Sequence, residues 1–334
     1  MTRTPFVSAS PNSAPPAVDR VSPGRARRVL RALAIASCVP YLALKTAWIA
    51  GSRIGIPDGS VLLEHRSLMI VANSITVLMD MAVVVLALLL TQPWGRRVKG
   101  RLLGLPIWVA TGLLSPIMVG FPLQLAASAF GGTTAPESRA EPFLDDWVFG
   151  AVYGGFILQG LTLGALFLLY AKGRWSHLWQ GRVWELPNAA TGPFMRITAA
   201  LGSLIVVFPT VMHLLWALGS TAGLSPARID QRTTDLYLLE GVRCLFALAA
   251  VAGVLLLAFR RAPSLPVKTP LALAWVGSAA LGAWGGWLLI ATLMPETDEV
   301  EQTSGLMVLT YSVEMISGLL LISAVGSLLR RRGA

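Results

Sequence analysis

The chain has 334 residues, of which 54% are hydrophobic and only 13% are charged, and its net charge is +10. Its mean hydropathy of +0.66 excludes a soluble globular domain, because such domains carry about 25% charged residues. The composition therefore predicts an integral membrane protein whose helices are solvated by lipid.

Residues 1–30 are rich in proline, serine, alanine and arginine, which is typical of a disordered leader. Eight apolar runs follow, each close to the roughly 20 residues that cross a bilayer core. The expected spans are 32–52, 67–91, 102–130, 147–170, 197–220, 236–259, 271–293 and 306–328. The predicted fold class is all-α, a polytopic transmembrane helical bundle.

The basic residues indicate how the spans are oriented. If the N-terminus is cytoplasmic, 20 of the 27 lysines and arginines fall before the first span, in the alternate loops on the same side, or in the C-terminal tail. The positive-inside rule then places both termini in the cytoplasm of a protein of the cell membrane. This asymmetry explains the net charge, so we expect no nucleic-acid partner.

A shift of 168 positions aligns residues 45–56 with residues 213–224 without a gap. Five residues, Lys45, Trp48, Gly51, Ser52 and Gly55, fall on His213, Trp216, Gly219, Ser220 and Gly223. This pattern predicts two parallel four-helix repeats, 31–171 and 197–334, joined by a cytoplasmic interfacial linker, 172–196. Chance similarity between apolar helices is the alternative.

The aligned Lys/His-x-x-Trp-x-x-Gly-Ser-x-x-Gly segment resembles one at the first helix of small four-helix bacterial membrane protein families that have no assigned function. The resemblance covers residues 45–56 and 213–224. It implies a tandem duplication of such a unit and transfers no activity.

Local sequence features predict how single segments behave. The third span has three prolines between Pro106 and Pro122 and is expected to be broken or bent. The seventh span carries a face of small residues from Ser278 to Gly286, which favours close helix packing. In the linker, Trp175 and its neighbours predict an amphipathic helix lying on anionic lipid headgroups at the cytoplasmic face.

Six ionisable side chains lie within the predicted spans: Lys45, Asp80, His213, Glu240, Arg243 and Glu314. A charge in lipid is costly, so these residues are expected to face the bundle interior and are the candidates for substrate binding or proton coupling. The alternative is structural, because Glu240 can pair with Arg243 on its own helix and Glu314 can neutralise Lys45. Asp80 has no basic residue near its depth and is expected to be either protonated or hydrated.

The sequence predicts neither a cofactor nor a metal site. It contains no paired-cysteine motif, no P-loop and no Gly-x-Ser-x-Gly elbow. A metal held by His65, His213 and an outer carboxylate is the one alternative left open.

Three functions are consistent with these features. The leading hypothesis is a small-solute transporter or permease-like protein, with Asp80 or Glu314 available for proton coupling. The second is a membrane-embedded enzyme acting on a lipid or other amphiphile, with His213, Glu240 and Glu314 as acid or base groups. The third is a non-catalytic subunit, assembly factor or sensor whose charges hold the helices together.

Overall fold

The computed structural model describes residues 24–58, 60, 63, 66–132, 144–230, 232–292 and 303–333. Within these residues the protein is all-α, with eight helical segments long and apolar enough to cross a membrane. The predicted fold class and the expected number of spans are therefore confirmed. The predicted leader lies outside the described residues up to position 23, and its last residues belong to the first helix.

Each predicted span lies on one of the long helical segments. These are α1 (Arg25–Ile49), α2 (Arg66–Thr91), α3 (Gly100–Ala129), α4 (Asp146–Trp175), α5 (Pro193–Ile205) with α6 (Val207–Ala217), α8 (Thr234–Ala258), α9 (Lys268–Ala291) and α10 (Gly305–Arg332). The short elements are η2 (Pro93–Arg97), η3 (Ser176–Leu178), η4 (Val183–Glu185) and α7 (Pro226–Asp230).

Proline interrupts a different span from the one expected. The third span forms one continuous helix, α3, with all its prolines inside it, so of the predicted break or bend the break is not found. The fifth span is divided at Val206 into α5 and α6. Pro209 lies four residues after Ile205 and has no N–H to bond the carbonyl of that residue, so the backbone hydrogen-bond ladder lacks one bond at the division.

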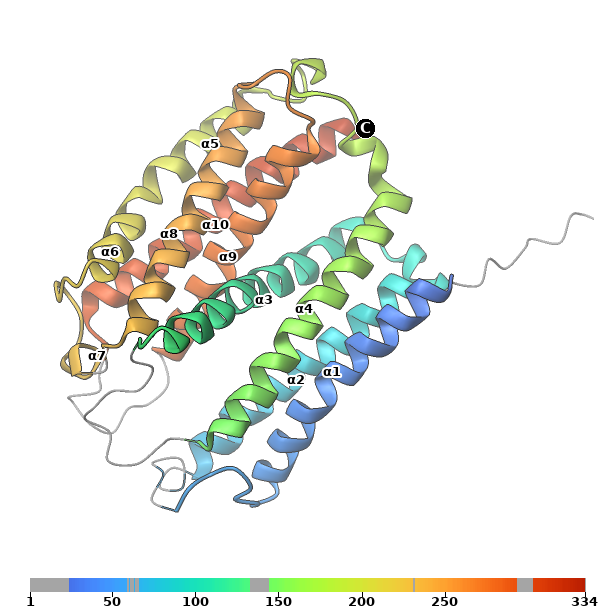
Figure 1. The fold of residues 1–334 in the computed structure, drawn as a ribbon. Coiled ribbons are helices and arrows are strands. Elements are labelled where there is room, and N and C mark those ends of the chain that lie inside the picture. Colours follow the sequence, from blue (N-terminus) through green and yellow to red (C-terminus); the bar gives the residue numbers. More distant parts are fainter. Residues whose placement is uncertain are drawn as a thin grey trace, which may run out of the picture.

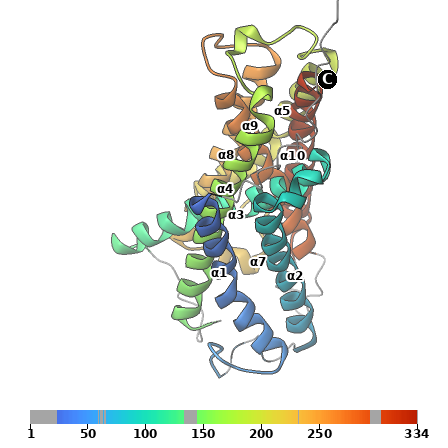
Figure 2. The same cartoon turned by 90° about the vertical axis from the view of Figure 1, so that its right-hand side faces the viewer.

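The helices form two groups with α3 between them. Figure 1 shows α1, α2 and α4 in one group and α5, α6, α8, α9 and α10 in the other, while α3 runs between them. Figure 2 shows the first group nearer the viewer, with α3 extending away from it. The start of α1 and the end of α10 lie at the same end of the bundle, as an even number of spans requires.

Small residues bring the helices of the second group into close contact. A Cβ at Gly277 would lie 2.6 Å from the carbonyl oxygen of Phe246 on α8. A Cβ at Gly318 on α10 would lie 2.6 Å from the Cα of Gly282 and 2.7 Å from the carbonyl oxygen of Ser278. The small face predicted for the seventh span, now α9, is therefore a packing face.

Between the two groups, α3 packs mainly against α9 rather than along α2. A Cβ at Gly112 would collide with the backbone of Ala279, so α3 approaches α9 as closely as two helices can. Hydrogen bonds reinforce this contact, since the indole N–H of Trp108 donates to Ser278 Oγ at 3.2 Å and that of Trp284 donates to the carbonyl oxygen of Leu113 at 3.2 Å. The space between α2 and α3 is thereby left open to form a cavity.

The linker does not form the amphipathic helix expected from its tryptophans. Residues 172–196 are all described, and they contain the end of α4, the turns η3 and η4, and the start of α5. Trp175 ends α4 and packs edge-on against Tyr170, with ring centroids 5.5 Å apart. Trp175 therefore packs against another side chain of the protein as part of α4. The spacing of the tryptophans alone could not distinguish this packing from an amphipathic helix on the lipid headgroups, so that prediction was wrong.

Candidate functional site

The six ionisable residues of the spans divide into two sites. His213 on α6, Glu240 and Arg243 on α8, and Glu314 on α10 come together in one group, which we call the ion-pair cluster. Lys45 on α1 and Asp80 on α2 instead line the cavity between the helices of the first group. Each site is formed by residues that are distant in sequence.

The ion-pair cluster is held together by contacts to both nitrogens of one imidazole. His213 Nδ1 lies 2.5 Å from Glu240 Oε2, and His213 Nε2 lies 3.4 Å from Glu314 Oε2. Arg243 Nη1 lies 3.4 Å from the same Glu314 oxygen, and Arg243 Nε lies 3.9 Å from Glu240 Oε2. The side chain of His213 is only 2% exposed.

Charge balance and geometry together indicate the protonation of the ion-pair cluster. Two ionised carboxylates and one guanidinium leave one negative charge, which is costly at membrane depth. Only an imidazolium can donate from both ring nitrogens, and each nitrogen of His213 faces a different carboxylate. A protonated His213 therefore both satisfies the geometry and makes the cluster neutral.

Of the two ion pairs predicted as purely structural, the contacts confirm one. The pairing of Glu240 with Arg243 within α8 is observed. The pairing of Glu314 with Lys45 is not observed, because Glu314 binds His213 and Arg243 instead.

The metal site that the sequence left open would have used His65, His213 and a carboxylate. In the described residues, no three histidine, cysteine or acidic side chains lie close enough together to hold a metal ion. His65 lies outside them.

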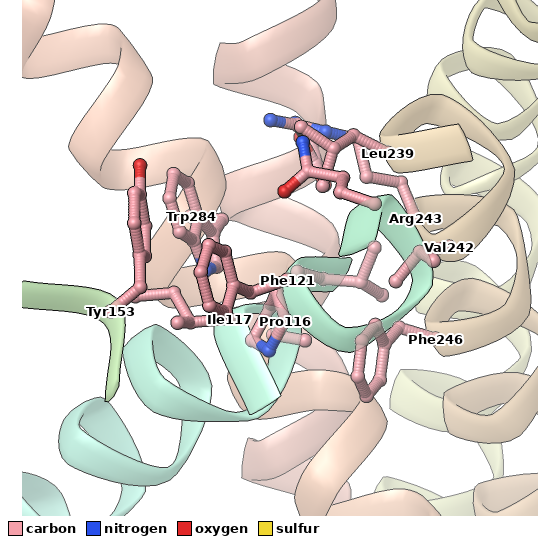
Figure 3. Close-up of a pocket in the computed structure, with 13 residues that line it drawn as sticks. Pro116, Ile117, Phe121, Tyr153, Leu239, Val242, Arg243, Phe246 and Trp284 are labelled. Atoms are coloured by element: carbon pink, nitrogen blue, oxygen red, sulfur yellow. Dashed lines mark hydrogen bonds and ion pairs between the residues drawn. The ribbon is translucent and has the colours of Figure 1, made fainter. Parts of the chain in front are cut away.

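A pocket of about 110 Å³ borders the cluster on the α3 side. Arg243 and Glu314 reach it, together with Gln124 of α3. Figure 3 shows Arg243 on one side of this pocket and Trp284 and Tyr153 on the other. The guanidinium carbon of Arg243 lies 5.9 Å from the ring centroid of Trp284, within the range of a cation–π interaction.

A larger cavity of about 580 Å³ lies between α1, α2, α3 and α4, and we call it the α1–α4 cavity. Its size falls within the range of about 300 to 1,000 Å³ that is common for small-molecule sites. Seven aromatic side chains line it: Tyr41, Trp48, Phe149, Tyr153, Phe156, Trp284 and Trp287. Trp284, Tyr153 and Ile117 line the smaller pocket as well, so the two spaces are neighbours.

Asp80 is the buried acid of the α1–α4 cavity. It is 4% exposed, and its Oδ1 accepts a hydrogen bond from Gln159 Nε2 at 3.1 Å. Among the described residues its Oδ2 has no hydrogen-bond partner. A buried acceptor without a partner destabilises a fold by about 1 to 3 kcal/mol.

Lys45 is held at one end of the same cavity. Its Nζ donates to Asn73 Oδ1 at 2.7 Å and lies 4.9 Å from the ring centroid of Trp48 and 5.1 Å from that of Tyr41. Lys45 and Asp80 form no ion pair in the described structure. The ammonium thus contacts an amide and two aromatic faces, and the Asp80 carboxylate acts on it only from beyond ion-pair distance.

Comparison of the chain with protein-family models, with curated proteins and with solved structures finds no match. The chemistry of the two sites therefore carries the functional argument.

The turn after Lys45 recurs after His213. The indole N–H of Trp48 donates to the carbonyl oxygen of Ile54 at 2.7 Å, and that of Trp216 donates to the carbonyl oxygen of Ala222 at 2.9 Å. Four glycines in these turns, Gly51, Gly55, Gly219 and Gly223, have φ values of 97°, 74°, 91° and 72°. Lys45 and His213 occupy corresponding positions one helical turn before these tryptophans.

Sequence reasoning missed the aromatic wall of the cavity. Trp284 and Trp287 belong to α9, and nothing in their local sequence separates a cavity-lining tryptophan from a packing one. By contrast, Asn73, Thr76 and Asp80 follow one another at helical spacing along α2, so the sequence does place these three polar side chains on one face of the helix. Asn73 holds Lys45, and Thr76 and Asp80 both line the cavity.

Proposed function

We propose that this multi-pass membrane protein is a small-solute carrier, a transporter or permease-like protein of the cell membrane, and that the α1–α4 cavity is its binding site. The observation that carries the proposal is Asp80, a buried carboxyl with an unpartnered oxygen at the wall of a 580 Å³ cavity. Polar groups at membrane depth are retained where they bind a solute or carry a proton.

A tandem duplication supports a carrier. We take residues 31–171 and 197–334 to be two parallel four-helix repeats, because the Trp48 turn and the Trp216 turn share their hydrogen bonds and positive φ values. The second and third helices of the two repeats are packed differently. In the second repeat α8 packs closely along α9, whereas in the first repeat α3 packs against α9 of the other repeat and hardly contacts α2. If the two halves are copies of one unit, this unit can pack its second and third helices together or apart, as the alternating exposure of a carrier site would require.

The expected topology fits the same proposal. The basic ends of α1 and α10 lie at one end of the bundle, where Arg27 donates to the carbonyl oxygen of Leu169 and Arg331 to that of Ala189. We assign this end to the cytoplasm, with anionic lipid headgroups as its partners. Lys45 then lies toward the outer face.

The two carboxyl candidates for proton coupling are not equivalent. Glu314 is 1% exposed and is engaged by both His213 and Arg243, so a proton that bound it would leave the neutral ion-pair cluster with a net positive charge. Asp80 borders the cavity and has an oxygen available. We therefore assign coupling to Asp80 and a structural role to the ion-pair cluster.

The burial of the ion-pair cluster argues against an enzyme that uses His213, Glu240 and Glu314 as its acid or base groups. An acid or base group must reach the substrate proton at hydrogen-bond distance. His213 is 2% exposed, and both of its ring nitrogens already face carboxylates. The third hypothesis is a non-catalytic protein whose charges only hold the helices together. It accounts for the ion-pair cluster in the second half of the chain, but it does not account for the α1–α4 cavity or for Asp80.

The test is thermal unfolding of the purified protein in a neutral detergent across a panel of small solutes. A ligand present at a hundredfold excess over its Kd should stabilise the folded state by about 2.7 kcal/mol, because it binds only that state. Asp80→Asn should lose this gain while keeping its own unfolding midpoint, since the amide preserves the shape of the side chain.

The matched control is Asp146→Asn, the same change at an exposed position in the first turn of α4. It should respond to the solute like the natural protein. The proposal fails if no solute stabilises the protein, or if the stabilisation survives in Asp80→Asn.

A further inference from the structure

We propose that the solute of the α1–α4 cavity is a lipophilic organic cation, an amine or quaternary ammonium on an aromatic or aliphatic body, and that its binding at Asp80 displaces one proton. This inference rests on the proposed function and names its substrate class. In the exchange, the O–H bond of the Asp80 carboxyl breaks, the proton passes to water, and the carboxylate pairs with the cation.

The polar groups of the cavity lack a positive partner for Asp80. Its Oδ2 can only accept a hydrogen bond or a positive charge when the group is ionised, and Gln159 already serves Oδ1. Lys45 does not contact that oxygen, because its ammonium is held by Asn73 and by two aromatic faces, and its charge acts on Asp80 only from beyond ion-pair distance. The unmet requirement at the cavity wall is therefore for a donor or a cation, rather than for an anion.

The aromatic wall suits the same ligand. Ammonium and other organic cations are attracted to the faces of tryptophan and tyrosine, more strongly where water is excluded. Trp284 and Trp287 on α9 offer such faces to a ligand, whereas Tyr41 and Trp48 on α1 already face the ammonium of Lys45. Most of its remaining lining is aliphatic, which favours a ligand whose body is lipophilic.

Charge balance explains why a proton should leave. The titratable groups that line the cavity or surround Asp80 are Lys45, Tyr41 and Cys38 on α1 and Tyr153 on α4. Among the described lining residues, those from α3 and α9 are apolar or tryptophan. With Asp80 protonated, the ammonium of Lys45 already gives the empty cavity one positive charge, so a cation that entered without an exchange would raise this charge to two, which is costly at membrane depth. Replacing the proton of Asp80 by the cation leaves the net charge unchanged.

The experiment compares two ions of the same shape and opposite charge. Tetraphenylphosphonium and tetraphenylborate are titrated into the full-length protein in a neutral detergent, and binding is followed by the fluorescence of the cavity tryptophans and by equilibrium dialysis. We expect tetraphenylphosphonium to bind at least about tenfold more tightly, a difference of about 1.4 kcal/mol.

The proton is measured directly in weakly buffered solution. We expect about one proton to be released for each cation bound, and the affinity to fall by up to about tenfold for each unit of decrease in pH, because one proton competes with one cation. Asp80→Asn should lose both the proton release and the pH dependence. Asp146→Asn, exposed on α4, should retain both.

The outcomes separate this inference from the proposed function. Equal binding of the two ions, binding without proton release, or proton release that persists in Asp80→Asn would each overturn the exchange of a proton for a cation. If a neutral or anionic solute then stabilises the protein through Asp80, the carrier proposal stands and only the substrate class is wrong. If no solute of any charge depends on Asp80, both proposals fail.

Discussion

Arg243→Met is expected to destabilise the folded protein by about 3 to 5 kcal/mol, the usual result of removing one partner from a buried ion pair. Arg243 is the cation shared by Glu240 and Glu314, and its side chain is 17% exposed. Without it, His213 alone must balance two carboxylates. The measurement is the unfolding midpoint in detergent, together with the yield of monodisperse protein.

Two further variants make the prediction specific to charge. Adding Glu314→Gln to Arg243→Met restores neutrality, with His213 facing only Glu240, and should recover most of the lost stability. Arg53→Met removes an arginine from an exposed pair with Asp58, where both side chains are mostly in solvent, and should change stability by no more than about 0.5 kcal/mol. A double variant as unstable as Arg243→Met would contradict the charge-balance argument.

The ion-pair cluster and the α1–α4 cavity lie in different halves of the chain. The cluster ties α6, α8 and α10 together through contacts that leave His213 and Glu314 almost without solvent. The cavity lies where α3 packs against α9 instead of against α2. Arg243 and Trp284 lie where the two sites meet, and the hydrogen bond from Trp284 to Leu113 joins α9 to α3 at this point.

The spans were predictable because length and apolar content alone decide whether a helix can cross a bilayer. The burial of Asp80, His213, Glu240 and Glu314 was predictable for a similar reason, since a charge in lipid turns inward. Both inferences need only the position of a residue along its own helix.

The sequence could not reveal which helices are neighbours. Glu314 was expected to meet Lys45, yet α10 packs beside α5 and α6 and brings Glu314 to His213. The cavity was hidden for the same reason, because it depends on the close approach of Gly112 to Ala279. A single glycine indicates that a helix can be approached closely, and it does not say by which partner.

Gly318→Ala is expected to disrupt the packing of α9 against α10, because the added methyl group would meet the backbone of Gly282 and of Ser278 rather than a movable side chain. Overpacking of this kind usually destabilises by about 1 to 3 kcal/mol, and rigid backbone on the opposite side favours the upper end. Gly326→Ala is the matched control on the same helix, since a Cβ there has nothing within 4 Å. Its expected effect is neutral or stabilising by up to about 1 kcal/mol.

The same substitution should also reach the ion-pair cluster. Gly318 lies one helical turn after Glu314, so any shift that relieves the methyl group moves the Glu314 carboxylate relative to His213 and Arg243. In Gly318→Ala the further loss caused by Glu314→Gln should therefore be smaller than in the natural protein, because the contact is already weakened. A double-mutant cycle by thermal unfolding measures this difference. Strictly additive losses would show that the α9–α10 crossing and the cluster are independent, and that the close packing of small residues does not hold the buried charges in register.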